Sequence, residues 1–133
     1  MPLAREDVMR VAEFRVALRR FLHAGELTAR GCGLTPQRYL LLLLIKGAPD
    51  SSESSTVTEL AERLHLAQST VTELVARAED AGLIERETAE YDGRVANLRL
   101  SREGERRLEC SFSALRDERS HLREAVQNLL GRV

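Results

Sequence analysis

A repeated pentapeptide near the middle of the chain limits the folds that this sequence can adopt. TVTEL occupies residues 56–60 and again 70–74, so the two copies start 14 residues apart (70 − 56). Around them, apolar residues recur at alternating spacings of four and three: Leu60, Leu64, Ala67, Val71, Leu74 and Ala78. Because 14 residues make two heptads and neither glycine nor proline interrupts the stripe, one continuous helix of the coiled-coil type would satisfy the pattern.

The local chemistry of the second copy favours a break instead. Residues 68–72 are QSTVT, and Ser and Thr favour the first turn of a helix, while Val and Thr lose rotamer freedom in its interior. His65 and Leu66 can turn the chain, since His tolerates positive φ better than most residues. The segment therefore also fits a helix-turn-helix, with one helix over 57–64 and the next from about Gln68. Periodicity alone leaves the two interpretations open.

The flanking segments contain further signals for helices and strands. Thr35 and Pro36 predict a helix start, and the apolar run that follows predicts a central core helix over 36–46. Alternation in Val95 to Leu100 and an Asp-Gly turn signal predict a hairpin of strands at about 83–87 and 95–100. The other expected elements are a long helix over 3–30, a loop over 47–55, a helix end at Gly82 and one last helix capped by Ser101, in whose first turn Gly104 is mildly unfavourable.

Both terminal helices carry apolar stripes. The first has Val11, Phe14, Leu18 and Phe21; the last has Leu108, Phe112, Leu115, Leu122, Val126 and Leu129, with Arg119 at the remaining heptad position. A single polar residue in such a seam can set its register. We expect these helices to pack on each other or on a second subunit.

Composition excludes several functional classes. The net charge of −1 gives no global nucleic-acid signal, so any DNA affinity must come from local patches. Spacing predicts no catalytic site, cofactor loop or metal cluster, so the chain is expected not to be an enzyme. The longest apolar run, 40–45, is too short for a membrane span, and the N-terminus has no signal-peptide pattern, so a cytoplasmic protein is expected.

Individual cysteines, histidines and aromatic residues suggest weaker hypotheses. Cys32 lies between glycines and is a candidate redox switch, but no basic neighbours are evident to activate its thiol. Cys110 is expected at the edge of the last helix's seam, and a reduced protein is the default. The three histidines show no metal-ligand spacing. Four aromatic residues are expected in the core or dimer seam, with a ligand cleft as the alternative: Phe14, Phe21, Tyr39 and Phe112.

Together, the segments GLTPQRYLLLLLIKG and LAERLHLAQSTVTELVARAEDAGLIERETAEYDGRVANLRLSREG resemble the multiple antibiotic resistance regulator (MarR) family, including an Asp-x-Arg at 92–94 where that family has its wing tip. The resemblance implies a mainly α fold with a small β-hairpin wing: a winged helix-turn-helix with N- and C-terminal dimerisation helices. It implies a single domain over 1–133, with the winged helix at about 34–104 and the dimerisation helices at about 3–30 and 105–131.

The resemblance also implies a function. The protein would be a homodimeric, ligand-responsive repressor that binds a palindromic promoter site in double-stranded DNA. Helix 68–81 would enter the major groove and wing 88–95 the minor groove. The effector would be a small aromatic or phenolic molecule.

The residues expected to touch DNA follow from these roles. Gln68 can pair with adenine, and the neighbouring hydroxyls can reach bases or phosphates. Arg94 would reach the minor groove, oriented by Asp92. The full set is Gln68, Ser69, Thr70, Thr72, Arg77, Arg86, Asp92 and Arg94.

The chain also departs from the family pattern at several positions. Gln68 and Glu73 stand where relatives often have a basic residue, Ala67 replaces an Asp or Ser N-cap, and His65 replaces a turn glycine. Between Ala67 and Asp80 there is one arginine against three carboxylates. A net-negative recognition helix repels phosphate, so the alternative is a dimeric winged-helix interaction protein with weak or lost specific DNA binding.

Overall fold

Helices dominate the computed structural model, which describes residues 2–88 and 96–130. The elements in chain order are α1 (Arg5–Gly31), α2 (Pro36–Lys46), α3 (Val57–Leu64), α4 (Gln68–Asp80), β1 (Ile84–Thr88), β2 (Ala96–Leu100), α5 (Arg102–Ala114) and α6 (Arg116–Leu130). The predicted class, mainly α with a small β-hairpin in a winged helix-turn-helix arrangement, is confirmed.

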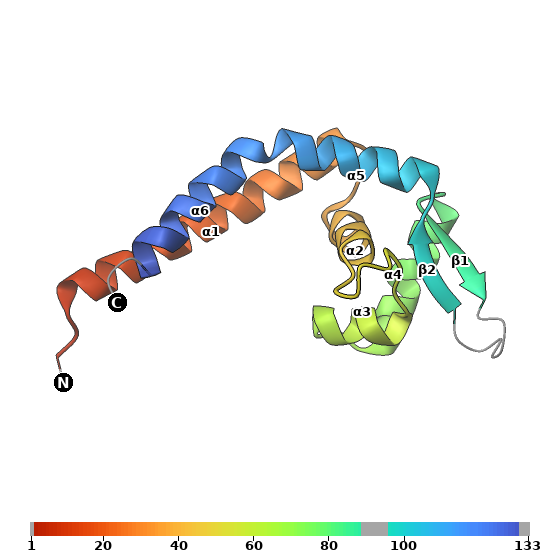
Figure 1. The fold of residues 1–133 in the computed structure, drawn as a ribbon, viewed down its shortest axis with the longest axis horizontal. Coiled ribbons are helices and arrows are strands. Elements are labelled where there is room, and N and C mark those ends of the chain that lie inside the picture. The colour runs from red at the N-terminus through yellow and green to blue at the C-terminus, as the bar shows by residue number, and fades with distance from the viewer. Residues whose placement is uncertain (1, 89–95, 131–133) are drawn as a thin grey trace.

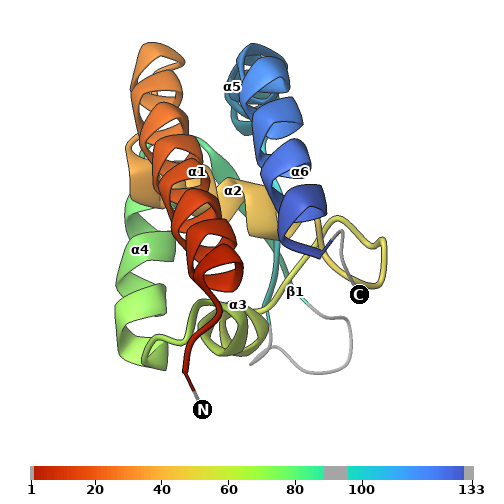
Figure 2. The same cartoon turned by 90° about the vertical axis from the view of Figure 1, so that its left-hand side faces the viewer.

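The helices form an arm and a more compact body. α1 and α6 run side by side along the arm in both views (Figures 1 and 2), and α5 leads from the arm back to the hairpin. The body contains α2, α3, α4 and the hairpin. The core is centred on α2, whose Leu41, Leu42 and Ile45 are almost completely buried beside Leu60 and Val75.

Side-chain caps start the body's first two helices where the sequence predicts. Thr35 Oγ1 accepts a hydrogen bond from the backbone N–H of Arg38 at 3.2 Å, and Pro36 follows at the first helical position. Thr56 and Glu59 form a reciprocal capping box, with bonds of 3.0 and 3.2 Å. These pairs satisfy first-turn amides that a helix cannot satisfy itself.

The repeated pentapeptide belongs to two helices, not to one. α3 ends at Leu64, and His65 adopts a left-handed conformation with φ of 56°. The backbone N–H of Leu66 then bonds to the carbonyl of Ala61 at 3.1 Å, which closes the helix end. His65 thus performs the chain reversal that a glycine often performs, because its cost in this conformation is moderate. The helix-turn-helix interpretation is confirmed.

The hairpin pairs β1 with β2 in antiparallel register, from Ile84 opposite Leu100 to Thr88 opposite Ala96. β1 begins one residue later than predicted, while the predicted start of the second strand, residue 95, lies outside the described residues. Leu83 instead belongs to the end of α4, where its N–H bonds to the carbonyl of Ala78 and Gly82 has φ of 75°. The expected helix end at Gly82 is therefore confirmed.

Gly104 is mildly unfavourable for the helix by propensity, as predicted, but the packing at this position requires a residue without a side chain. A Cβ at this position would lie closer than 3.0 Å to the carbonyl oxygen of Leu83. Gly104 also takes part in the N-terminal cap of α5, because its backbone N–H donates a hydrogen bond to Ser101 Oγ at 3.0 Å. The absence of a side chain lets the start of α5 pass directly over the end of α4.

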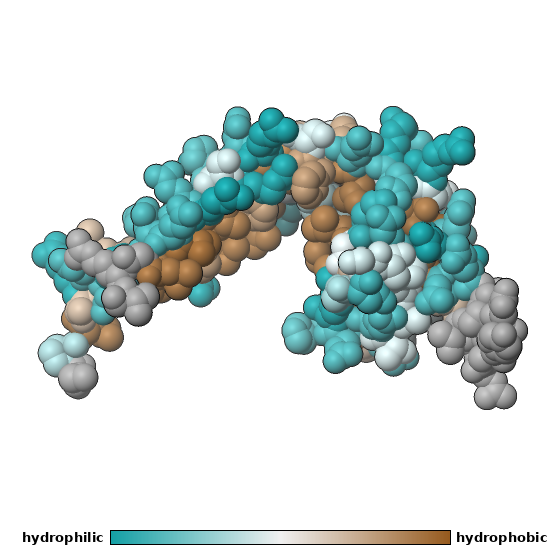
Figure 3. All heavy atoms as spheres, viewed as in Figure 1, coloured by the Kyte–Doolittle hydropathy of each residue, from teal (hydrophilic) through white to brown (hydrophobic). Residues whose placement is uncertain are grey.

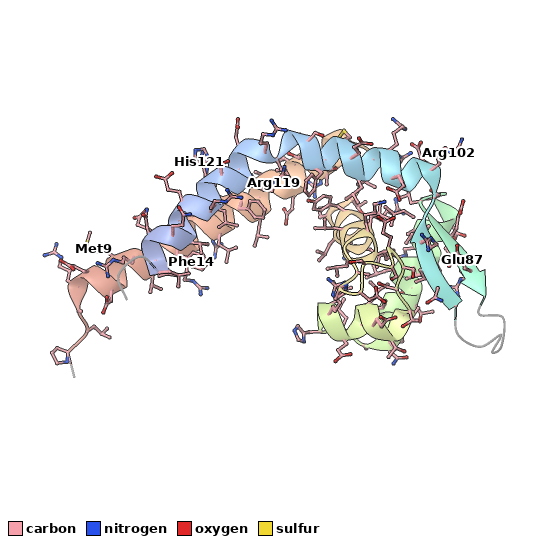
Figure 4. The ribbon with its side chains drawn as sticks, in the orientation of Figure 1. Met9, Phe14, Glu87, Arg102, Arg119 and His121 are labelled. Atoms are coloured by element: carbon pink, nitrogen blue, oxygen red, sulfur yellow. A yellow bond between two sulfur atoms is a disulfide. The ribbon has the colours of Figure 1, made fainter. Side chains whose placement is uncertain are left out.

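The prediction of a single last helix is wrong, because the helix is divided at Leu115 into α5 and α6. Leu115 has φ of −98° and ψ of 12°, and its N–H reaches only the carbonyl of Phe112, at 3.4 Å. Arg119, the polar residue of the predicted seam, donates to that same carbonyl at 2.7 Å and lies 4.0 Å from the centre of the Phe112 ring. Figure 4 shows Arg119 where α5 passes into α6. The Arg119 side chain thus connects the start of α6 to the end of α5.

The two cysteines form a disulfide, which corrects the prediction of separate, reduced thiols. Cys32 follows the end of α1 and Cys110 lies on α5, 78 residues later. Beside it, Arg107 Nη1 donates to the carbonyl of Gly33 at 2.8 Å. The arm's first helix is therefore fastened to α5 next to the body. Sequence separation had hidden this proximity.

Candidate nucleic-acid interface

The face of α4 that points away from the core is polar over its first two turns. Val71, Val75 and Ala78 are completely buried and hold the helix against the body. Four of the predicted contact residues are exposed on the same helix: Gln68, Ser69, Thr70 and Thr72. In the part of the chain that the structure describes, none of these four side chains makes a hydrogen bond. Their donors and acceptors are therefore available to a partner.

The N-terminus of α4 differs from those of α2, α3 and α5. Those three helices begin at Thr35, Thr56 and Ser101, whose side chains accept from first-turn amides. α4 begins at Ala67, which has no side-chain acceptor. Its first-turn N–H groups, together with the helix dipole, favour an anion at this end.

The arginine on α4 already has an anionic partner within the chain. Arg77 Nη2 lies 2.5 Å from Glu73 Oε1, one helical turn away, and both side chains are more than 60% exposed. The spacing of four residues places the two side chains on one stripe of the helix. This partner is visible in the sequence as a Glu-x-x-x-Arg pattern, although Glu73 was interpreted there as a departure from the family's basic residue and as part of the negative charge of the helix.

Arg86 on β1 is held in the same way by Glu79 on α4. Its Nε lies 2.9 and 3.0 Å from the two carboxylate oxygens, and its Nη2 lies 2.8 Å from Oε1. The hydrogen bond that Arg86 donates to the Glu79 carboxylate raises the pKa of Arg86, so the guanidinium stays charged. Glu79 was missed by sequence reasoning, because it reaches Arg86 across two different elements.

The hairpin strands repeat this pairing. Arg99 on β2 lies 3.6 Å from Glu87 on β1, and Figure 4 shows Glu87 on the hairpin beside the grey trace. Thus Arg77, Arg86 and Arg99, the only arginines of α4, β1 and β2, each face a carboxylate. Asp92 and Arg94 lie outside the described residues, so the predicted wing-tip contacts stay predictions.

A cleft of about 480 Å³ lies between α2 and α5. Leu43, Leu108 and Phe112 supply apolar walls, while Lys46 and Glu105 lie at a polar side. Lys46 Nζ contacts Glu105 at 2.9 Å and Glu53 at 3.0 Å, and these hydrogen bonds raise its pKa.

The other aromatic residues take different places. Phe112 lines the cleft and is 49% exposed, whereas Tyr39 packs against the core, and its burial raises the pKa of the phenol. Phe14 and Phe21 are partly buried on α1. Among the described residues, no three acidic, His or Cys side chains gather closely enough to hold a metal ion. Within that same part, no helix is long and apolar enough to cross a membrane.

Comparison with known proteins gives a family match for the central part of the chain and several solved structures of the same fold. Residues 33–95 match the model of the MarR family. A MarR-family transcription regulator of known structure is 21% identical, with a TM-score of 0.72 over 88% of this chain and 75% of its own. YusO from Bacillus subtilis is 21% identical, with a TM-score of 0.68 over 98% of this chain and 100% of its own.

A third structure is a mutant of MarR from E. coli complexed with operator DNA. It is 18% identical, with a TM-score of 0.67 over 92% of this chain and 85% of its own. No curated protein sequence matches the chain. The predicted family resemblance is confirmed by the match of residues 33–95 to the MarR-family model, and these solved structures share the fold of this chain.

Proposed function

Since residues 33–95 are of the MarR type and the chain has the fold of MarR-family transcription regulators, we propose that it is a homodimeric, ligand-responsive repressor that binds double-stranded DNA. The observation that carries the proposal is the exposed, unpartnered polar face at the start of α4. A solved protein of this fold is complexed with operator DNA. The proposed unit is a single domain over 1–133.

In this proposal α4 enters the major groove with its N-terminal end toward the bases. Gln68 can donate and accept at adenine, and Thr72 lies one turn further along the same stripe. Ser69 and Thr70 serve bases or phosphates, and the uncapped amides of the first turn favour a phosphate.

The remaining contacts lie further along the helix and on the hairpin. Arg77 and Arg86, both exposed, can reach phosphates on either side of the groove. The wing, 88–95, would place Arg94 in the minor groove, with Asp92 orienting it. Glu73 stays outside this set.

The homodimer is proposed from the arm. Its apolar surface gathers along the lower side of the arm in Figure 3. Exposed large apolar residues of α1 include Val8, Met9, Val11, Val16, Leu22 and Leu27, and α6 buries no residue fully within its described range. Such a surface indicates a partner. A second copy would pair helices 3–30 and 105–131 and present two winged helices, about 34–104, to a palindromic site.

The dimer can be broken by charge. Val11 and Leu22 share a face of α1, since they are three turns apart, and both are about half exposed. The double variant Val11→Glu/Leu22→Glu is expected to run as a monomer in size-exclusion chromatography with light scattering, because four carboxylates would meet in the interface. The matched control, Thr58→Glu/Ala76→Glu, adds the same charge to exposed positions of the body. A dimeric arm variant, or a monomeric wild type, would contradict the proposal.

The cleft between α2 and α5 is the proposed effector site. Its volume of about 480 Å³ suits a small molecule, and Leu108 and Phe112 can contact an aromatic or phenolic ring. It adjoins α5, which joins the arm to the hairpin. An occupant there can change how the two winged helices are spaced.

A second candidate function is a dimeric winged-helix interaction protein with weak or lost specific DNA binding. The observation that favours it is the charge of α4, which has one arginine against three carboxylates. Steep salt dependence of binding to a palindromic site separates the two candidates, because phosphate contacts release counterions.

Substitutions in the proposed contact set test the function. Gln68→Ala is expected to weaken binding to DNA from just upstream of the protein's own gene by about 1–3 kcal/mol, while leaving nonspecific binding unchanged. Arg94→Ala is expected to weaken specific and nonspecific DNA binding alike. It should also reduce the slope of log K against log salt by about one. Both are measured by fluorescence anisotropy.

The matched control is Gln37→Ala, at an exposed position of α2. Wild-type affinity in Gln68→Ala would contradict the assignment of α4, and wild-type affinity in Arg94→Ala would contradict the assignment of the wing.

A further inference from the structure

The charges on the α4 and hairpin surface have a common arrangement. Its three arginines face five carboxylates within α4, β1 and β2. Each arginine is in an ion pair: Arg77 with Glu73, Arg86 with Glu79 and Arg99 with Glu87. Asp80 and Glu85 make no ion pair in the part of the chain that the structure describes. Each arginine of these three elements, all within the described residues, therefore already has a carboxylate partner when an anion approaches.

The two pairs that involve α4 occupy guanidinium nitrogens that could otherwise donate to phosphate. Glu79 presents both carboxylate oxygens to Arg86, at 2.8 to 3.0 Å. Glu73 contacts a terminal nitrogen of Arg77. A guanidinium binds carboxylate and phosphate with the same fork of N–H donors, so the two anions compete for the same atoms.

Both pairs are open to such competition. The side chains of Arg77 and Glu73 are 61% and 63% exposed, and that of Arg86 is 45% exposed. Exposed ion pairs are weak, so they can exchange, but each exchange leaves a carboxylate beside the DNA. The carboxylate partner thus lowers the contribution of each arginine to DNA affinity, although the arginine stays on the surface.

We propose that Glu73 and Glu79 are internal competitors of DNA phosphate, which hold Arg77 and Arg86 and restrain the affinity and salt dependence of DNA binding. This inference rests on the proposed DNA-binding function. It assigns a role to the carboxylates of α4 that differs from simple repulsion: they act on DNA through two named arginines. Glu73 and Glu79 are positioning residues, since neither is proposed to touch the DNA.

The test compares Glu73→Gln/Glu79→Gln with wild type in a fluorescence-anisotropy titration. The probes are a duplex from upstream of the protein's own gene and a shuffled duplex of the same composition. Freeing two arginines is expected to steepen the slope of log K against log salt by up to about two and to tighten binding to both duplexes at least about tenfold at 0.1 M salt. The effect should be absent when Arg77→Ala and Arg86→Ala are added.

Asp80→Asn is the matched control, since it removes a charge from α4 without freeing an arginine. Its effect should be smaller and should leave the slope unchanged. Thermal unfolding of each variant checks that the fold is retained, and Glu73→Gln alone replaces the double variant if the Glu79 change unfolds the hairpin. One released arginine then predicts a slope change of about one.

Three results would overturn the inference. A double variant that binds as wild type does, or no more tightly than Asp80→Asn, shows that the arginines are not restrained. An equal gain in the background without Arg77 and Arg86 shows simple repulsion. If neither wild type nor any variant binds either duplex, the proposed function itself fails and the inference fails with it.

Discussion

Gly104→Ala is expected to lower the free energy of unfolding by about 2–4 kcal/mol, because the added methyl group has no room in a closely packed position. The new Cβ would collide with the carbonyl oxygen of Leu83. That carbonyl cannot move freely, because it accepts the N–H of Ser101 at 2.9 Å while the N–H of Leu83 bonds to Ala78 at 3.0 Å. The collision therefore disturbs the end of α4 and the cap of α5 together.

Thermal unfolding by circular dichroism at one protomer concentration measures this loss, expected as a fall in Tm of roughly 10 °C. Gly31→Ala is the matched control. Gly31 ends α1, and a Cβ there would meet nothing within 4 Å. Its Tm should stay the same or rise slightly, because alanine favours helix more than glycine does. A Gly104→Ala protein as stable as wild type would show that α5 does not pass so closely over α4.

Reduction of the Cys32–Cys110 disulfide is expected to remove about 2–5 kcal/mol of stability. The two cysteines are 78 residues apart, so the bond closes a long loop that includes α2, the helix-turn-helix and the hairpin. In the chain-entropy account, a loop of this length restricts the unfolded state strongly. The native contact of Arg107 with Gly33 stays, so we expect the reduced protein to fold in the same way at lower Tm.

The measurement is thermal unfolding with and without a dithiol reductant. The variant Cys32→Ser/Cys110→Ser should unfold at the Tm of the reduced wild type and should not respond to the reductant. An oxidised and a reduced wild type with equal Tm would contradict a stabilising disulfide. A free-thiol count of two in the untreated protein would contradict the disulfide itself.

The elements that the sequence predicted correctly have local causes. Thr35, Thr56 and Ser101 start helices because each accepts a hydrogen bond from an amide three residues later. His65 divides the repeated stretch because its left-handed conformation is a property of that residue and its neighbours. Such signals lie within a few residues of one another and can be read without knowledge of the fold.

The features that were missed depend on residues distant in sequence. Gly104 is needed because α4 ends underneath it, and Cys32 meets Cys110 because α1 ends beside α5. The division at Leu115 occurs inside a continuous apolar stripe and carries no glycine or proline. No local pattern in the sequence marks any of these three features.

The candidate site shows the same difference. The exposure of Gln68, Ser69, Thr70 and Thr72 follows from the spacing of the apolar residues that α4 buries, which are Val71, Val75 and Ala78. The pair of Arg86 with Glu79 joins a strand to a helix and could not be read from spacing. The sequence therefore predicts which side chains of α4 are exposed better than it predicts the ion-pair partners of the arginines.

Binding of the wild-type protein to DNA is the direct test of the proposed sequence-reading regulator. Fluorescence-anisotropy titrations would compare the duplex from upstream of the protein's own gene with a shuffled duplex of equal length, at two salt concentrations. We expect tighter binding to the upstream duplex, and weaker binding to both duplexes at the higher salt concentration. Equal affinity for the two duplexes, or no binding to either, would contradict a sequence-reading regulator and favour a winged helix that binds protein partners.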